Sequence, residues 1–375
     1  MAYTYSKKTE LTALVVEVIA YILFLPLLLL RKRKPINPKR FLFVEPFQMG
    51  DVLSLTPMFD ALLRKFSGCE IYLLAKPSSA EVLKFDDRVK EIFEIDCPWS
   101  DQGPKQFSIL RMYKVLRATI CLRAYYFEVG LDTRGDLRSQ VLMVLAGCRL
   151  RLGYTVYLHS NIKLRGWLLS RKISQSTHHH RFYWNLELLS LLGISFLKIE
   201  FPSLVLKPQL FDKYPTGHVV IHVGGGWEFK RWAENKWAEL ICKLATGKKV
   251  IFVIASVAEA SILDTVKNMV CRVSLSQNIL FTTTSLVQMI GLIRGCEKFI
   301  GVDSGPMNLA VCLNKPTLVL FGPGDSVMWR PLTIGSRFIH KKEKYLCNPC
   351  FQKLCKFPES NCVRVISVEE FVQLM

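Results

Sequence analysis

The sequence predicts an α/β protein of two Rossmann-like, doubly wound domains that face each other across a cleft, with a hydrophobic anchor helix at the N-terminus. Short apolar strands alternate with helices in two series, and a long apolar run precedes them. The 375 residues suffice for two domains at the rough prior of about 150 each. We expect an N-terminal hydrophobic anchor and basic linker at 1–38, a first Rossmann-like domain at 39–210 and a second Rossmann-like domain with a cysteine-rich C-terminal tail at 211–375.

The composition indicates a basic protein with substantial cores. Apolar residues make up 50% of the chain, and 50 Lys and Arg stand against 31 Asp and Glu, which gives a net charge of +19. Such a charge predicts an anionic partner, which is a membrane surface, a phosphorylated substrate or nucleic acid. No nucleic-acid-binding module is recognisable, so we expect no nucleic-acid partner.

The N-terminal segment is an apolar run from Leu11 to Leu30, followed by the basic block Arg31–Lys34. Twenty helical residues can cross a hydrocarbon core of about 30 Å, and the basic block argues against a secretory signal. Glu17 and Pro26 weaken a spanning helix, because a carboxylate at membrane depth costs about 2.5 to 3.5 kcal/mol. A helix lying on the membrane and a buried core helix are the alternatives. The positive-inside rule places the body of the protein in the cytoplasm.

The first domain begins after the linker with strand–helix alternation. We expect strands at Phe41–Glu45, Glu70–Ala75, Val89–Ile95 and Phe127–Asp132, and helices at Val52–Phe66, at Lys105–Leu122 and up to Ala146. Asp51 follows Gly50 at the first strand-to-helix turn. A carboxylate there is most often only a helix cap, but one that faces a cleft is also suited to be a general base for a hydroxyl nucleophile.

The middle of the chain, from about Tyr154 to Leu210, is less regular. It contains His178, His179 and His180 in sequence. Adjacent histidines do not share one helical face, so we do not expect all three to bind a metal. A polar helix start before Phe182 is the expected structure.

The second domain repeats the alternation from His218 onward. Its expected strands are His218–Val223, Lys249–Ile254, Asn278–Phe281, Lys298–Val302 and Thr317–Phe321. Two such halves bind ligands at the carboxyl ends of their strands. The loops at those ends are rich in glycine, acids and bases, at Gly224, Gly225 and Gly226, at Lys230 and Arg231, at Glu259, at Asp303, Ser304 and Gly305, and at Gly322–Asp325.

These loops have the chemistry of a phosphate site. Consecutive glycines let a ligand approach the backbone, and Lys230 and Arg231 supply positive charge. The stretch Asp303–Pro306 predicts a helix start, whose free N–H groups favour an anion such as a diphosphate. Ordinary turns and a capped helix are the alternative. The dinucleotide, P-loop and nucleophile-elbow fingerprints are absent, which argues against hydride transfer and P-loop chemistry.

Four of the twelve cysteines are clustered. Cys347, Cys350, Cys355 and Cys362 form C-x2-C-x4-C-x6-C, whose spacing is compatible with a metal site, with disulfides or with reduced thiols. The paired spacing of common zinc modules is absent. The other eight are dispersed in apolar segments, as small buried hydrophobes are.

Five ordered blocks, at 43–57, 129–139, 220–232, 300–310 and 320–325, resemble the heptosyltransferase family of bacterial lipopolysaccharide synthesis. Its members are inverting glycosyltransferases of the GT-B fold. The resemblance implies transfer of a sugar, with heptose suggested, from a nucleotide-diphosphate donor to a lipopolysaccharide-core or other anionic glycolipid or polysaccharide acceptor. It implies no metal or other cofactor. Together with the N-terminal segment and the positive-inside rule, it predicts a location at the bacterial inner membrane with the catalytic domains facing the cytoplasm.

The resemblance makes 39–210 the acceptor-side domain and 211–375 the nucleotide-sugar-binding domain, and it also implies roles for matching residues. Asp51 matches the catalytic base, and Lys230 matches the lysine that binds the donor phosphates. Asp303, Ser304 and Gly305 match the donor-binding loop, and Glu259 falls near an expected ribose contact.

Two features depart from the family pattern. Asn308 stands where members commonly carry histidine, and asparagine cannot supply positive charge to a phosphate. The N-terminal apolar segment is the second departure. A catalytically weak nucleotide-sugar-binding or scaffold member, and an enzyme of the same fold that uses another sugar donor, are therefore the alternatives.

Overall fold

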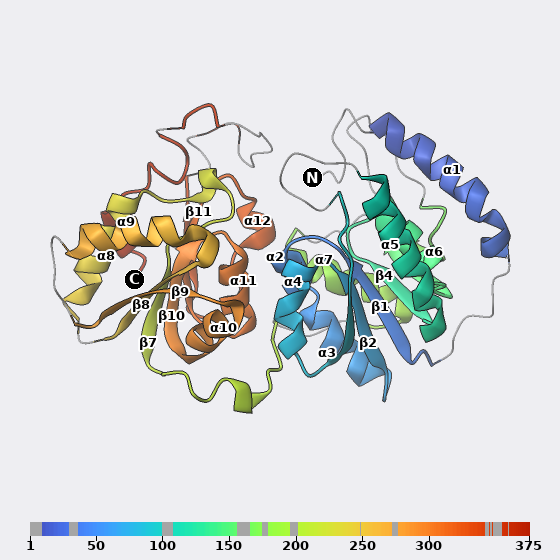
Figure 1. Ribbon diagram of the computed structural model, residues 1–375, viewed down its shortest axis with the longest axis horizontal. Helices are drawn as coiled ribbons and strands as arrows, with labels where there is room; N and C mark the ends of the chain where they lie inside the picture. The colour runs from blue at the N-terminus through green and yellow to red at the C-terminus, as the bar shows by residue number, and fades with distance from the viewer. Residues whose placement is uncertain are drawn as a thin grey trace. The chain divides into compact units, whose positions relative to one another are not determined.

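The protein forms two compact units, Met1–Glu200 and Phe201–Met375, each built around a six-stranded parallel sheet (Figure 1). The computed structural model describes residues 10–29, 37–99, 108–155, 166–174, 179–195, 202–247, 249–271, 277–341, 345, 347, 355–358 and 360–375.

The first sheet has the strand order β3-β2-β1-β4-β5-β6. Its strands are β1 (Arg40–Glu45), β2 (Glu70–Ala75), β3 (Val89–Glu94), β4 (Val129–Asp132), β5 (Leu150–Tyr154) and β6 (Arg171–Ile173). The sequence predicts the first four and misses the last two. β5 contains Arg151, whose buried guanidinium donates to two backbone carbonyls, those of Leu168 and Cys148. A charged residue and a glycine within five positions hide the apolar pattern of a buried strand.

Helices cover both faces of this sheet. They are α2 (Met49–Leu53), α3 (Thr56–Lys65), α4 (Pro77–Ala80), α5 (Ile109–Cys121), α6 (Leu137–Leu145) and α7 (Arg181–Leu188). The single helix expected at Val52–Phe66 is wrong, because the chain breaks into α2 and α3. Pro57 lies in the first turn of α3, where its missing N–H does no harm, whereas in the interior of a longer helix it would break a hydrogen bond. The expected polar helix start is confirmed, since His180 caps α7 by accepting from the Phe182 N–H, while His178 lies outside the described residues.

The second sheet repeats this topology in the order β12-β11-β10-β7-β8-β9. Its strands are β7 (His218–His222), β8 (Ile251–Ser256), β9 (Ile279–Thr284), β10 (Cys296–Val302), β11 (Thr317–Phe321) and β12 (Arg337–His340). The helices of this unit are α8 (Glu234–Ala245), α9 (Ala260–Cys271), α10 (Leu286–Gly295), α11 (Gly305–Cys312), α12 (Ser326–Trp329) and α13 (Val368–Val372). Five strands are confirmed, and β12 is an addition.

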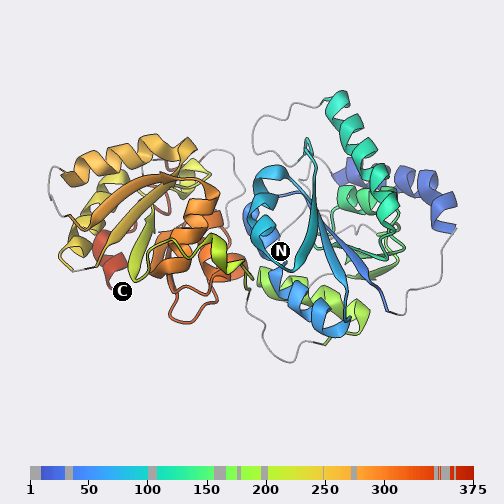
Figure 2. The same ribbon diagram turned by 60° about the horizontal axis from the view of Figure 1, so that its bottom comes forward.

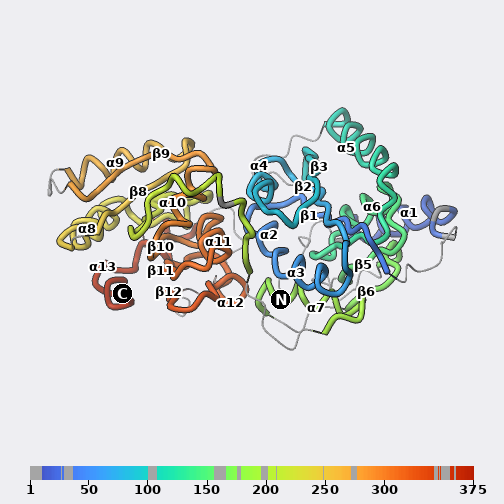
Figure 3. Tube along the Cα trace, turned by 90° about the horizontal axis from the view of Figure 1, so that it is seen from below, coloured from blue at the N-terminus to red at the C-terminus, as the bar shows by residue number. Residues whose placement is uncertain are grey.

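The C-terminal tail is part of the second core. α13 packs against α8, as Figure 3 shows near the C-terminus. Trp232 and Trp237 are buried and meet edge to face at 5.0 Å, and Phe371 of α13 packs on Trp232. The Trp232 indole also donates to the Ile366 carbonyl at 3.0 Å.

Each sheet has a switch point where the strand order reverses. β1 pairs with both β2 and β4, and β7 pairs with both β8 and β10. In doubly wound sheets, the loops at the carboxyl ends of such strands enclose a crevice that binds ligands. The loops after β1 and β4, and those after β7 and β10, are therefore the places to look for a site.

α1 (Glu10–Leu29) packs against α6 of the first unit. Its Ala20 and Leu28 share a buried cluster with Leu137 and Val144 of α6 and with Leu168. Within the described residues, no helix combines the length and the apolar character that crossing a bilayer requires. The expected spanning anchor is thus not confirmed, and the basic block at 31–34 lies outside the described residues.

Candidate active site

Asp51 lies in the first turn of α2, directly after β1. Its carboxylate accepts from the Gln48 N–H at 3.2 Å and completes a capping box, so the cap expected from the sequence exists. The same carboxylate also accepts a hydrogen bond from Arg134 Nη1 at 2.6 Å. Asp51 is therefore both a cap and the acidic half of an ion pair at the end of the sheet.

Arg134 comes from the loop between β4 and α6. Its guanidinium lies 4.1 Å from the centre of the Phe47 ring, a cation–π distance. Asp132 shapes the loop, since its Oδ1 accepts from the N–H groups of Arg134 and Gly135 at 3.1 Å each. Gly135 has a φ of +73°, which other residues rarely adopt. Two loops that are distant in sequence thus fix the Asp51–Arg134 pair.

Glu45 is a buried acid next to this pair that the sequence reasoning missed. It ends β1, and its Oε2 accepts from Thr133 Oγ1 at 2.7 Å and lies 3.4 Å from Arg181 Nη2. Its Oε1 has no hydrogen-bond partner among the described residues. Burial, and then the nearby charge of Asp51, raise the pKa of Glu45 to about 7. The one sequence signal was a glutamate at the end of an otherwise apolar strand.

Asp132 is a second buried acid of the cluster. Burial and the charge of Asp136 raise its pKa to about 7. Gln140 Nε2 donates to its Oδ2 at 3.2 Å, while Asp136 caps α6. The first unit thus gathers several carboxyl groups and two arginines at the switch point of its sheet.

The glycine loop of the second unit follows β7, and two charged side chains hold it. Glu259 accepts from the Gly225 N–H at 2.6 Å, and Arg231 Nε donates to the Gly225 carbonyl at 2.8 Å. A Cβ on Gly224 would lie 2.4 Å from the Glu259 carboxylate, whereas one on Gly226 would meet nothing within 4 Å. Side-chain and backbone atoms thus lie close to Gly224 and Gly225, whereas the space beside Gly226 is open.

His222 lies beneath this loop at the end of β7. Its Nε2 is 3.7 Å from the Glu259 carboxylate, and its ring is buried. Burial lowers the pKa of His222, so the imidazole is neutral near pH 7. Glu259 is thus bonded to the protein through the glycine loop and through Ser256 Oγ at 2.6 Å, and its expected ribose contact stays a prediction.

Lys230 and Asp303 form an ion pair at the switch point of the second unit. Lys230 Nζ lies 2.6 Å from Asp303 Oδ2, and Asp303 is nearly buried at the end of β10. A Cβ on Gly324 would come within 2.0 Å of the same oxygen. The structure therefore brings together three loops that the sequence predicted separately.

The start of α11 lies beside this pair. Ser304 is its N-cap residue, but the hydroxyl donates to the Val302 carbonyl at 3.0 Å and no side chain caps the helix. Pro306 occupies the first turn, and Asn308 Nδ2 donates back to the Ser304 carbonyl at 3.2 Å. An uncapped helix start beside a lysine is suited to bind an anionic group.

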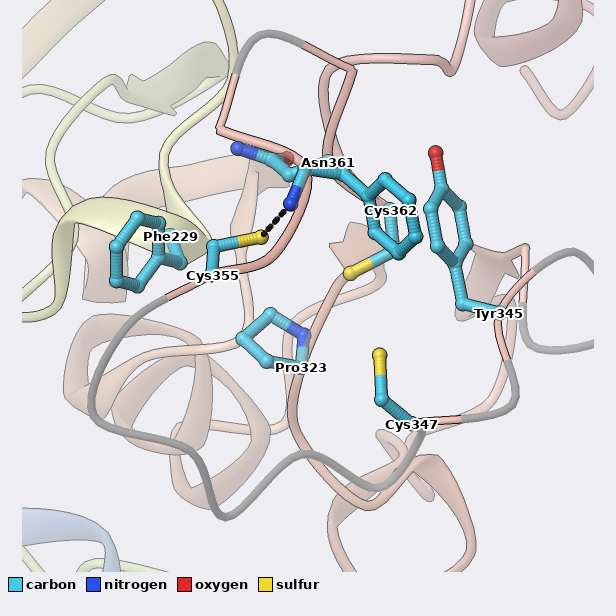
Figure 4. Close-up of a pocket in the computed structure, with 8 residues that line it drawn as sticks. Phe229, Pro323, Tyr345, Cys347, Cys355, Asn361 and Cys362 are labelled. Atoms are coloured by element: carbon cyan, nitrogen blue, oxygen red, sulfur yellow. Dashed lines mark hydrogen bonds between the residues drawn. The ribbon is translucent and has the colours of Figure 1, made fainter.

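The C-terminal cysteines line a small pocket with Tyr345, Phe357 and Asn361, next to Phe229 and Pro323 of the loops just described (Figure 4). The thiols of Cys347 and Cys362 point into it, and Cys355 closes one side. Cys347 and Cys355 are free thiols, while Cys350 lies outside the described residues. Across the part of the chain that the structure describes, no group of three or more His, Cys, Asp or Glu is placed to hold a metal. The state of the four-cysteine cluster stays a prediction.

The family comparison matches residues 115–360 to the model of glycosyltransferase family 9 (heptosyltransferase). Among curated proteins, lipopolysaccharide heptosyltransferase 1 of Pseudomonas aeruginosa is 28% identical over 336 residues, covering 85% of this chain and 88% of the relative. Lipopolysaccharide heptosyltransferase 3 of Escherichia coli is 23% identical over 312 residues, covering 75% and 83%.

Solved structures share the fold. The E. coli heptosyltransferase WaaC with ADP-2-deoxy-2-fluoro heptose aligns with a TM-score of 0.69 at 17% identity, covering 89% of this chain and 98% of that one. E. coli ADP-heptose lipopolysaccharide heptosyltransferase II aligns with a TM-score of 0.67 at 16% identity, covering 89% and 97%. The predicted pair of parallel-sheet α/β domains is confirmed.

Proposed function

Because the chain belongs to glycosyltransferase family 9, the heptosyltransferase family, we propose that it transfers heptose from ADP-heptose to a lipopolysaccharide-core acceptor. The donor proposal draws on the structural relatives named for ADP-heptose and its fluoro analogue, and the acceptor proposal draws on the curated relatives. The observation that supports transfer most directly is the ion pair of Lys230 and Asp303 at the uncapped start of α11. A lysine and a helix N-terminus suit the diphosphate of a nucleotide sugar.

The second unit would hold the donor. The open edge of the glycine loop at Gly226 lets the ligand approach the backbone, and Lys230 would contact the phosphates. As the sugar leaves, negative charge grows on the diphosphate oxygen. Lys230 and the N–H groups of α11 would stabilise that charge without a metal.

The first unit would activate the acceptor. Asp51 accepts the proton of an acceptor hydroxyl, whose oxygen bonds to the anomeric carbon while the bond from that carbon to the diphosphate oxygen breaks. Attack from the face opposite the leaving group inverts the configuration. The support for Asp51 as the base is its position, since its carboxylate lies at the carboxyl end of β1 and is held there by Arg134 Nη1 at 2.6 Å.

The variant Asp51→Asn tests the base assignment. We expect kcat to fall by about 10²–10⁴-fold, the usual contribution of a general base, with donor affinity unchanged. Asp96→Asn is the matched control, because Asp96 also pairs with an arginine at 2.6 Å but on the exposed surface of the same unit. Steady-state kinetics with ADP-heptose and calorimetric titration of ADP measure the two quantities.

Normal turnover of Asp51→Asn would overturn the base assignment. The acceptor is tested separately by mass spectrometry of lipopolysaccharide from a deletion strain, where we expect the core to lack one sugar. An unaltered glycan profile would contradict the proposed acceptor and leave the base assignment to be decided by the kinetics.

A catalytically weak member that binds nucleotide sugars is the second candidate, and Asn308 favours it. Its side-chain amide donates to the Ser304 carbonyl, and it carries no charge to offset that of the diphosphate. Donor binding without turnover across a panel of acceptors, together with activity gained on Asn308→His, would select this candidate. Turnover by the unmodified protein would reject it.

We also propose that the protein works at the cytoplasmic face of the bacterial inner membrane. The support is its net charge of +19, since the inner leaflet and a lipopolysaccharide precursor are both anionic.

A further inference from the structure

We infer that α1 and α5 form a docking face by which the first unit lies on an anionic bilayer. This face, here called the α1–α5 face, consists of the exposed residues Leu11, Val15, Val18, Ile19, Ile22 and Leu23 of α1, and Ile109, Leu110, Tyr113, Lys114, Arg117 and Ile120 of α5. The inference deepens the proposed membrane location and rests on it, and it is independent of the proposed reaction.

The two sides of α1 differ in what they contact. One side is buried against the protein and contains residues at helical spacing, namely Ala13, Glu17, Ala20 and Leu28. The opposite side carries large aliphatic residues, of which Ile22 is 62% and Leu23 is 68% exposed. A helix that faces water normally turns its polar side outward. In α1 the carboxylate faces inward and the aliphatic side faces out, so an apolar medium suits the outward side.

Glu17 fixes α1 to the unit. Its Oε1 accepts from the backbone N–H groups of Gly166 at 2.6 Å and of Trp167 at 3.4 Å. The ring centres of Tyr21 and Trp167 lie 5.1 Å apart. A helix threaded across the bilayer would lose these contacts and place the carboxylate in hydrocarbon. The docked helix instead keeps the carboxylate bonded and leaves its aliphatic side at the surface.

α5 supplies the charge that the outward side of α1 lacks. Ile109, Tyr113 and Ile120 are exposed on this helix, and the exposed Lys114 and Arg117 lie beside them. Apolar and basic residues side by side on one surface helix are typical of helices that lie in the membrane interface. Both α1 and α5 pack against α6, and Figures 1 and 2 show them on the same side of the first sheet.

These observations favour a bilayer over a second copy of the chain as the occupant. Two copies meeting at this face would bring Lys114 and Arg117 close to those of the partner, on a chain whose net charge is +19. An anionic lipid surface instead attracts these cations and receives the aliphatic side chains.

Vesicle flotation of the full-length protein tests the inference, with phosphatidylcholine vesicles that contain or lack phosphatidylglycerol. We expect binding to the anionic vesicles, and at least roughly tenfold weaker binding for Ile22→Ser/Leu23→Ser, because two aliphatic side chains no longer enter the lipid. Val257→Ser/Ile334→Ser is the matched control, since both residues are exposed aliphatics of the second unit, and it should bind normally. Circular dichroism verifies that each variant is folded.

A charge variant and an extraction complete the test. Lys114→Glu/Arg117→Glu should lose the preference for anionic vesicles, and alkaline carbonate should release the bound protein. Undiminished binding of the Ile22/Leu23 variant overturns the inference, as does resistance to carbonate, which indicates a spanning helix. A dimer that dissociates in that variant, without vesicle binding, assigns the face to a second copy instead. Vesicle binding is measured without a sugar donor, so failure of the proposed reaction leaves its outcome unaffected.

Discussion

Asp51 and Lys230, the residues expected to carry the chemistry, each have an opposite charge at 2.6 Å, from Arg134 and Asp303 respectively. At the scale of single residues, these partners do more than neutralise charge. They hold flexible side chains in place before a ligand arrives, which reduces the entropy lost on binding. The contributions of Lys230 and Asp303 to the free energy of donor binding should therefore be coupled.

A double-mutant cycle on Lys230→Met and Asp303→Asn measures this dependence. We expect Lys230→Met to weaken ADP binding roughly 10–100-fold, the cost of losing a charge-assisted hydrogen bond. The coupling energy should be about 1–2 kcal/mol, because Asp303 acts by positioning Lys230. Isothermal titration calorimetry gives the four affinities.

The control for this cycle is Lys249→Met, which breaks a surface pair with Glu297 and should leave ADP affinity unchanged. A coupling energy near zero would mean that Asp303 does not position Lys230 for the donor.

Glu45 predicts a pH dependence of stability. Its pKa is 4.5 as a free side chain and about 7 in the folded protein, so the folded state holds an extra proton between these values. The stability from that proton is complete below pH 4.5 and is lost as pH rises through 7, by on the order of 3 kcal/mol. Glu45→Gln removes the titration. Its free energy of unfolding relative to wild type should therefore rise across this window.

Urea unfolding at a series of pH values checks this expectation. Glu94→Gln is the control, because that side chain is exposed on β3 of the same sheet. A relative stability of Glu45→Gln that stays flat with pH would show that Glu45 is not the group that holds the proton.

At the scale of elements, the site is built from strand-to-helix loops that the protein itself fills tightly. The loop after β7 is fixed at Gly225 by Glu259 and Arg231, and Gly324 lies against the Asp303 carboxylate. In these loops, glycine is required where a side chain of the protein approaches. It is optional where the loop is open, and the two cases can be separated by experiment.

Gly224→Ala and Gly226→Ala form a matched pair for this purpose. The new methyl group of Gly224→Ala would displace the Glu259 carboxylate, so we expect a loss of about 1–3 kcal/mol of stability and at least roughly tenfold weaker ADP binding. Gly226→Ala meets no atom within 4 Å and should keep wild-type stability. Thermal unfolding and calorimetry measure both effects. Equal losses from the two substitutions would contradict this account of the loop.

At the scale of the whole molecule, the two units have the same strand topology but different chemistry at their switch points. The first gathers buried acids and arginines, and the second gathers glycines, a lysine and an uncapped helix start. In the proposed function, the same arrangement of strands therefore serves two ligands. We therefore expect a nucleotide diphosphate to bind to the second unit and to protect the backbone of that unit alone.

Hydrogen–deuterium exchange of the full chain with and without ADP tests this division. We expect slower exchange at 224–231, 303–312 and 322–325, because bound ligand stabilises the state that binds it. The loops after β1 and β4 should exchange at unchanged rates. Equal protection around Asp51 would place the nucleotide in the first unit and contradict the proposed donor site.

The fold was largely predictable from local patterns. The buried parts of β1 and β10, Phe41–Val44 and Phe299–Val302, are short apolar runs that an acid follows, and this signal lies within a few residues. β5 and β6 were missed for the converse reason. β6 has three residues, and β5 buries an arginine whose partners are carbonyls from other segments.

The sequence alone determined the two α/β series and the loops of the candidate site, because strand, turn and helix signals depend on neighbouring residues. Only the tertiary structure decided which charges meet. Asp51 pairs with Arg134, 83 positions away, and Glu45 contacts Arg181, 136 positions away. The contact by which α1 docks on the first unit, from Glu17 to Gly166, could likewise not be predicted from the sequence, since these residues are 149 positions apart. Pairings of this kind arise from the packing of distant segments, which no local pattern encodes.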